Sequence, residues 1–252
     1  MLSDQQIEFY KKNGFVVPDF SISNSDLVEI RELQEKFVLK YPEFRDYCST
    51  LLAYETGFLR FLKIPEIISM VSQIIGENIA LWNSSLFSKP AHNGLTTPWH
   101  QDGEYWPIRP LKTCTVWLAI DDATTENGCL QYMPGSHLQQ ELRQHKTDNT
   151  SKYTLNQEIT ADAYDEDKAF NLEIKAGQIA LHDVYIVHGS KANQSSKPRR
   201  SMTMRYMPTS SVFDRELAAE MHKKTKIQHQ DRTLFLMKGI DLSGKNDFIQ
   251  RK

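Results

Sequence analysis

The sequence predicts a mainly β protein with flanking α-helices, built as a sandwich or barrel such as a jelly roll. Two observations lead to this prediction. The first third of the chain has the apolar spacing of helices, whereas from Asn78 onward apolar residues recur with a period of two in short segments. Turn residues separate these segments, and no linker divides the two parts. We therefore expect the N-terminal helices to pack on one sheet of a single β domain.

Three helices are expected in the first third of the chain. Ser3 and Gln6 have the spacing of a capping box, and Asn13-Gly14 would end the helix that they begin. The other two helices are expected at about residues 24–39 and at residues 65–75, where Gly76 follows. A short strand is expected at residues 15–18.

The strands expected after Asn78 are short and rich in β-branched residues. They are residues 79–88, 112–120, 129–133, 169–174, 178–187 and 199–207. The polar stretch 138–167 is too long for an ordinary connection and is typical of a lid or binding loop. We expect one domain over residues 1–252, in which 1–77 is helical support, 78–208 the β core and 209–252 a C-terminal extension.

Composition excludes several classes of protein. The net charge of −2 gives no electrostatic case for nucleic acid or an anionic membrane as a partner. Three cysteines without a Cys-x-x-Cys pair make a disulfide framework unlikely and favour a reducing compartment. No apolar run approaches about 18 residues, and the N-terminus lacks the features of a signal peptide. We expect a cytoplasmic protein that acts on a small molecule; its oligomeric state stays open.

A possible metal site centres on His100 and Asp102. On an extended strand, residues i and i+2 point to the same face, so this imidazole and carboxylate would lie side by side. His188, in the segment His-Gly-Ser, is the best candidate for a third ligand. Two histidines and one carboxylate form the facial triad of non-haem Fe(II) oxygenases. The alternative is that His-x-Asp is only a surface strand pair or a turn.

An arginine follows His188 by eleven residues. In the strand 199–207, Arg199, Ser201, Thr203 and Arg205 share one face, and Arg200 points to the other. An arginine binds a carboxylate through two parallel hydrogen bonds, so Arg199 could hold an anion beside the metal. The alternative is that Arg199 and Arg200 are two surface charges after a turn.

The ordered set of motifs resembles the phytanoyl-CoA dioxygenase family over almost the whole chain. The motifs are WHQDGEYWP at 99–107, VWLAIDDATTENGCL at 116–130, MPGSH at 133–137, HGS at 188–190 and PRR at 198–200. The opening QIEFYKKNGF at 6–15 and the late GIDLSGKNDF at 239–248 fit the same family. The resemblance implies a double-stranded β-helix, which is the cupin-like form of the jelly roll. It also implies a hydroxylase that uses Fe(II), O2 and 2-oxoglutarate and releases succinate and CO2.

The same resemblance implies roles for individual residues. His100, Asp102 and His188 would be catalytic iron ligands, and Arg199 would bind the distal carboxylate of 2-oxoglutarate. Three further residues are expected to contact this co-substrate: Ser190, Trp117 and, as a weaker match, Asn83. Halogenating relatives lack the carboxylate ligand, so Asp102 argues against halogenation. Desaturation and ring closure stay open beside hydroxylation.

Other functions remain alternatives at this stage. A zinc or manganese hydrolase would use the same triad but has no need for Arg199, and a non-catalytic binding protein would need neither. Within the family, an acyl-CoA hydroxylase is possible. The polar residues near the triad instead favour a small polar or anionic metabolite, with contacts expected from Tyr105, Trp106, Arg109 and Arg205. His182 is expected to be a buried or loop histidine nearly 20 Å from His188, at about 3.3 Å per strand residue.

Overall fold

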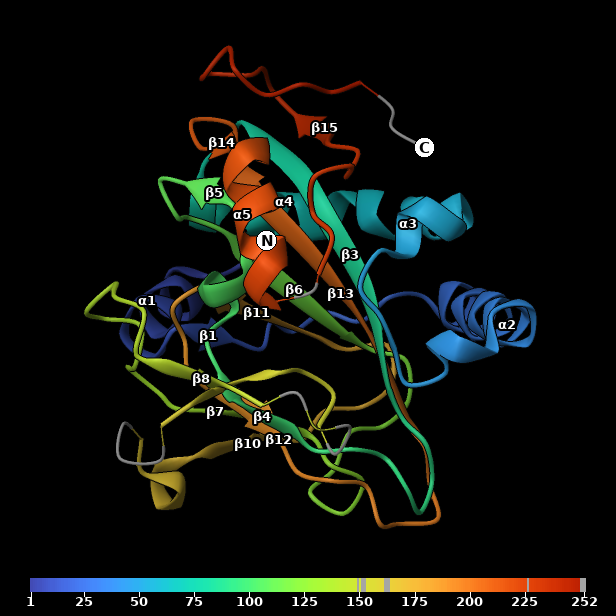
Figure 1. Ribbon diagram of the computed structural model, residues 1–252. Coiled ribbons are helices and arrows are strands. Elements are labelled where there is room, and N and C mark those ends of the chain that lie inside the picture. The colour runs from blue at the N-terminus through green and yellow to red at the C-terminus, as the bar shows by residue number, and fades with distance from the viewer. Residues whose placement is uncertain (149, 151–152, 161–163, 226, 250–252) are drawn as a thin grey trace.

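Two antiparallel sheets and a layer of helices make up the molecule (Figure 1). The structure, a computed structural model, describes residues 1–249 except 149, 151–152, 161–163 and 226. The helices of the N-terminal third lie on the outer side of the larger sheet, and the smaller sheet lies on the other side of it. The predicted mainly β fold with N-terminal helices packed on one sheet is confirmed.

The strands that are neighbours in each sheet are mostly far apart in the sequence. The larger sheet has the order β1 (Phe15–Val16), β11 (Ile179–Asp183), β6 (Cys114–Ala119), β13 (Arg199–Pro208), β3 (Ile79–Lys89) and β15 (Phe235–Lys238), and β2 (Tyr47–Cys48) also pairs with β3. The smaller sheet has the order β10 (Phe170–Leu172), β7 (Leu130–Tyr132), β12 (His188–Ser190) and β4 (Thr97–His100). Two separate pairs are β14 (Val212–Phe213) with β5 (Ile108–Arg109), and β8 (His145–Thr147) with β9 (Gln157–Ile159).

The predicted helices are present, with the predicted ends. Ser3 Oγ accepts a hydrogen bond from the Gln6 amide, and the Gln6 side chain accepts one from the Ser3 amide, so the capping box forms. Gly14, which has a φ of 83°, ends this first helix in the left-handed conformation that glycine adopts most easily. The α-helices are α1 (Asp4–Asn13), α2 (Asn24–Lys40), α3 (Leu51–Tyr54), α4 (Pro65–Ile75) and α5 (Arg215–Thr225). The 3-10 helices are η1 (Pro42–Phe44), η2 (Thr56–Lys63), η3 (Asp102–Tyr105) and η5 (Glu166–Lys168).

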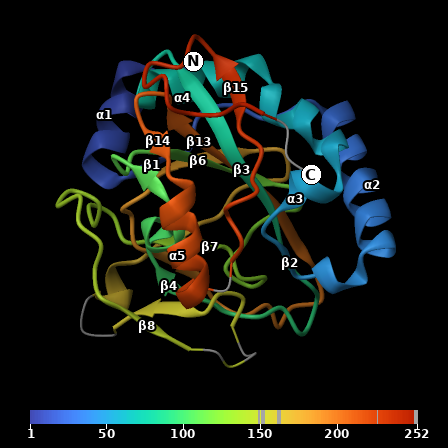
Figure 2. The ribbon, with the colours of Figure 1, turned by 45° about the horizontal axis from the view of Figure 1, so that its top comes forward.

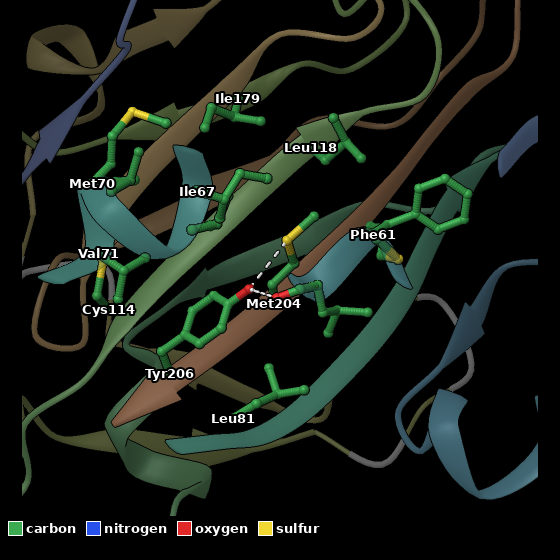
Figure 3. Packing of buried hydrophobic residues seen from close by; sticks show 14 of the residues in the cluster. Phe61, Ile67, Met70, Val71, Leu81, Cys114, Leu118, Ile179, Met204 and Tyr206 are labelled. Carbon is green, nitrogen blue, oxygen red and sulfur yellow. Dashed lines mark hydrogen bonds between the residues drawn. The ribbon is translucent and has the colours of Figure 1, made fainter. Parts of the chain in front are cut away.

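The main hydrophobic core lies between these helices and the larger sheet. Figure 3 shows Met204 and Tyr206 of β13 packed against Ile67, Met70 and Val71 of α4. The Tyr206 hydroxyl donates a hydrogen bond of 2.8 Å to the carbonyl oxygen of Leu62. Because alternate residues of a strand face opposite sides, this packing turns the odd-numbered residues of β13 toward the space between the sheets.

Two segments differ from the prediction. Residues 178–187 are not one strand: β11 ends at Asp183, whose carboxylate accepts a hydrogen bond from the Tyr185 amide, and the chain then crosses to the smaller sheet as β12. The stretch 138–167 contains the β8–β9 hairpin, and Gln157 of β9 donates its amide to the Tyr105 hydroxyl at 3.0 Å. Positions 149, 151–152 and 161–163 of this predicted loop lie outside the described residues.

The C-terminal part of the chain returns to the sheets. α5 lies across the front of the molecule in Figure 2, and the segment after it runs back toward β3 before β15 pairs with that strand. Across the described ranges, every helix is too short or too polar to cross a membrane.

Candidate metal centre and co-substrate pocket

The structure brings His100, Asp102 and His188 together between the two sheets. His100 ends β4 and lies opposite His188, the first residue of the neighbouring strand β12. Gln101 is extended, so the side chain of Asp102 returns to the same side as His100. Asp102 itself begins η3, not a strand position as predicted. One ligand atom from each of the three buried residues lies within 4.8 Å of the others.

Gln101 fixes the backbone between the first two of these residues. Its side chain is fully buried, and its Nε2 donates to the carbonyl oxygens of Glu141 at 3.0 Å and Tyr185 at 2.7 Å. Its Oε1 accepts a hydrogen bond of 2.7 Å from the Arg143 amide. Sequence reasoning missed this role, because all of these partners are distant in the chain.

Hydrogen bonds orient both imidazoles for coordination. Nδ1 of His100 lies 2.8 Å from the Pro98 carbonyl oxygen, and Nδ1 of His188 lies 3.0 Å from that of Ile186. A carbonyl oxygen only accepts, so each Nδ1 is the protonated nitrogen and each Nε2 keeps its lone pair. The two Nε2 atoms lie 3.7 Å and 4.0 Å from Oδ1 of Asp102. The donor set therefore fits a divalent metal bound as a facial triad.

The charges at the site favour the ligand forms of these side chains. Burial alone would raise the pKa of Asp102, but interactions with His100 and His182 and the charge on Arg205 hold it well below its usual value. Burial, followed by the effect of His100, lowers the pKa of His188 well below 6.5. The carboxylate is thus ionised and the imidazole neutral, as metal coordination requires.

His182 lies beside this triad, and the predicted separation of nearly 20 Å is wrong. Its ring centroid is 5.0 Å from that of His188, and its Nε2 is 3.5 Å from Oδ2 of Asp102. The prediction treated residues 178–187 as one extended strand, but His182 is on β11 and His188 is on the opposite sheet. The expectation that His182 is buried is correct, and the Tyr132 hydroxyl lies 2.8 Å from its Nδ1.

Arg199 enters the same pocket from β13. Its Nε donates to the Gly128 carbonyl oxygen at 3.2 Å, its Nη1 donates to Ser201 Oγ at 3.0 Å, and its guanidinium lies 5.5 Å from the Trp117 ring. Burial lowers the pKa of Arg199 to about 10. Among the described residues, no carboxylate lies within 4.0 Å of this guanidinium, so a bound dicarboxylate would supply its missing counter-charge.

The other predicted co-substrate residues fall into two groups. Ser190 and Trp117 line the pocket with Arg199 and the triad. Asn83 instead lies in a neighbouring cavity, where its Oδ1 accepts a hydrogen bond from Arg232. Thr203, which shares the face of Arg199, lines the same pocket, whereas sequence reasoning missed four other lining residues: Phe87, Thr97, Thr115 and Leu130.

Three of the four residues expected near the substrate lie close to the triad. Tyr105, Trp106 and Arg205 line the cavity that also contains Asp102. Arg109 does not: it is exposed, and its Nη1 donates to the carbonyl oxygens of Trp106 and Ile108. The structure therefore does not bring Arg109 to the site.

Comparisons with known proteins agree with this geometry. A model of the phytanoyl-CoA dioxygenase (PhyH) family matches residues 10–201. A probable phytanoyl-CoA dioxygenase of Caenorhabditis elegans is 27% identical over 239 residues, covering 82% of this chain and 75% of that protein. A probable alpha-ketoglutarate-dependent hypophosphite dioxygenase of Stutzerimonas stutzeri is 29% identical over 147 residues, covering 58% of this chain and 51% of that protein.

The solved structures confirm the predicted fold class. The non-haem monooxygenase ThoJ, in its apo form, superposes with a TM-score of 0.76 at 22% identity, covering 98% of this chain and 87% of that one. The predicted double-stranded β-helix is thus shared with a non-haem oxygenase. The family match spans both histidines, the aspartate and Arg199. The chain belongs to the phytanoyl-CoA dioxygenase family and is a non-haem iron dioxygenase that depends on 2-oxoglutarate and O2.

Proposed function

We propose that the protein hydroxylates a small polar or anionic metabolite, with release of succinate and CO2, at an iron held by His100, Asp102 and His188. One observation carries this proposal: the buried triad shares a pocket with a buried arginine that has no carboxylate partner among the described residues. A binding protein or a metal hydrolase would not need that arginine, and family membership decides against both.

Each residue of the pocket has a distinct task in this scheme. His100, Asp102 and His188 would hold the iron, which would supply O2 activation coupled to the oxidative decarboxylation of 2-oxoglutarate. Arg199 binds the distal carboxylate of the co-substrate through its two-pronged guanidinium. Ser190 and Trp117 line the space beside it, and Asn83 is a weaker candidate for a co-substrate contact because it lies in the neighbouring cavity. The buried walls keep bulk water away from the reacting atoms.

The preference for a polar or anionic substrate rests on the cavity next to Asp102. Arg205 is buried there, with its guanidinium 5.3 Å from the Trp106 ring. The relative from Stutzerimonas stutzeri is named for an oxyanion, hypophosphite. An acyl-CoA hydroxylase is the second candidate, because other relatives are named as phytanoyl-CoA dioxygenases. We also propose a cytoplasmic location.

A metabolite screen tests the substrate proposal. Succinate release from 2-oxoglutarate would be measured with a library of small polar and anionic compounds and with long-chain acyl-CoA thioesters. We expect a compound of the first kind to stimulate release, and the stimulation to be lost in Arg205→Ala but kept in Arg109→Ala, which changes an exposed arginine. Stimulation only by acyl-CoA thioesters, unaffected by Arg205→Ala, would contradict the proposal.

A further inference from the structure

A second buried arginine lies beside Arg205 in the cavity next to the metal centre. Arg232 belongs to the segment that follows α5 and is 8% exposed. Its Nε donates to His229 Nδ1 at 2.7 Å, and its Nη1 donates to the carbonyl oxygen of Ser49 at 2.8 Å and to Asn83 Oδ1. The guanidinium is therefore held in one orientation by three separate parts of the chain.

Both guanidiniums retain donors that the protein does not use. Nη1 of Arg205 donates to Ser85 Oγ at 2.6 Å, but its Nε is buried without a partner among the described residues. Nη2 of Arg232 is likewise buried, and no hydrogen-bond acceptor of the described chain reaches it. A buried donor without a partner is costly, and a charged one more so, which suggests that a ligand completes these bonds.

The charge in this cavity is also unbalanced. No carboxylate of the described ranges lies within 4.0 Å of either guanidinium, and burial lowers the pKa of Arg232 to about 9. The acid that lines the cavity is Asp102, which belongs to the metal triad. Two buried cations without their own counter-ion form a site for an anion.

The cavity borders the metal pocket on one side and an outer pocket on the other. It shares Phe87, Asp102 and Arg205 with the pocket that holds the triad. It shares Asn83 and Arg232 with an outer pocket of about 350 Å³, which lies where α3 and β3 approach the segment after α5. Arg232 thus stands between the outer pocket and the metal.

Arg199 and Arg205 both line the pocket that holds the triad, at two separate positions on β13. They share one face of this strand but are six residues apart, which is about 20 Å along a strand. One end of the chamber therefore suits the co-substrate, and the other end is left for the molecule to be hydroxylated.

We infer that Arg205 and Arg232 form the subsite that binds an oxyanion of the primary substrate, which arrives through the outer pocket. The substrate class is a small organic molecule with a carboxylate or a phosphoryl-type group, which the two arginines would hold beside the metal triad. This inference rests on the proposed function and extends it, because it assigns the anion site to a residue of the C-terminal segment.

The test uses anion binding by the protein loaded with Mn(II) and 2-oxoglutarate, without turnover. Inorganic phosphate and acetate serve as probes, and the shift of the melting temperature with probe concentration gives each affinity. We expect at least one probe to bind. Its affinity should fall more than about tenfold in Arg205→Lys and in Arg232→Met, because both changes remove the guanidinium N–H donors that would bind the anion. Arg109→Lys is the matched control on an exposed arginine and should keep the affinity. The probe that binds identifies the head group as phosphoryl-type or carboxylate.

Two results would overturn the inference: affinities within about twofold of the wild type in both variants, or equal loss in Arg109→Lys. If Arg232→Met does not fold, Arg232→Lys replaces it, and Arg205→Lys still decides. The stabilisation by 2-oxoglutarate alone is recorded in the same samples. If 2-oxoglutarate does not stabilise the wild type, the proposed function is refuted. If 2-oxoglutarate stabilises all the proteins and the variants bind the probe as the wild type does, only the anion subsite is refuted.

Discussion

Two neighbouring arginines show that a shift of one position along a strand moves a side chain from the pocket to the opposite face. Arg199 faces the chamber between the sheets, whereas Arg200 faces outward, where its Nε and Nη2 bind the Asp121 carboxylate at 2.8 Å and 2.9 Å. Arg200 also pairs with Glu35 at 3.1 Å. The alternation read from the sequence is confirmed, and the two positions form a natural pair for comparison.

We expect Arg199→Lys to raise the apparent KM for 2-oxoglutarate by about 10- to 100-fold. The reason is that lysine cannot form the second hydrogen bond to the carboxylate, and a hydrogen bond to a charged group contributes about 1.5–3 kcal/mol. Iron affinity should change little. Steady-state kinetics with Arg200→Lys as the control measure the difference. Equal effects of the two substitutions would contradict the assignment of Arg199 to the co-substrate.

Lys89 carries a pH dependence. Lys89 on β3 lies opposite Arg199 on β13, and its side chain is buried, with 2% exposed. Burial, followed by the charge of Arg199, holds the pKa of Lys89 well below 10.5. At a pH between the lowered pKa of Lys89 in the folded protein and its ordinary pKa of 10.5 in the unfolded chain, the unfolded chain binds a proton that the folded chain does not. The lysine therefore contributes stability that rises with pH in this window, by at most about 1.4 kcal/mol per pH unit.

Lys89→Met should remove that contribution. The free energy of unfolding of the variant should exceed that of the wild type by most near neutral pH. This difference in stability should shrink as the pH approaches 10.5. Urea denaturation of both proteins at about pH 7 and about pH 9.5 measures it. Parallel stability curves would show that Lys89 titrates normally.

At the scale of elements, β13 connects the core to the site. Its even-numbered residues Met202, Met204 and Tyr206 pack under the helices, and Arg199, Thr203 and Arg205 line the cavities on the other side. The packing of the even-numbered residues therefore determines which residues of β13 face the cavities. Substitutions on the core face should change stability, whereas substitutions on the cavity face should change function.

Met204→Ala should lower the free energy of unfolding by about 2–5 kcal/mol, because Met204 is fully buried in the main core. The KM for 2-oxoglutarate should stay within about twofold, since the side chain points away from the pocket. Chemical denaturation and kinetics check both. Leu242→Ala, at an exposed leucine, is the control. A small loss of stability together with a large change in KM would refute this division of β13.

The elements also show what sequence alone can predict. The capping box, Gly14 and the alternation of β13 are local patterns, so they could be read directly. The turn after Asp183 could not, because only the partner strands show that residues 178–187 divide between two sheets. His182 was misplaced for that reason.

At the scale of the whole molecule, the site draws on the entire chain. The triad and Arg199 fall within motifs and were predicted, although their roles as ligands remain a proposal. Arg232 carries no motif, and it meets Asn83 across 149 positions of sequence. A contact of this kind arises from the packing of the C-terminal segment on β3, which local patterns do not encode. Arg109, close to the metal motif in sequence, is turned away by its pairing in β5.

The most direct test of the central claim is succinate formation from 2-oxoglutarate by the purified protein, without a primary substrate, with and without added Fe(II). The account predicts slow release that requires Fe(II), falls more than about 100-fold in Asp102→Ala, and is unchanged in Asp122→Ala, which alters an exposed aspartate. Release that is independent of Fe(II), or that persists in a folded Asp102→Ala variant, would contradict it.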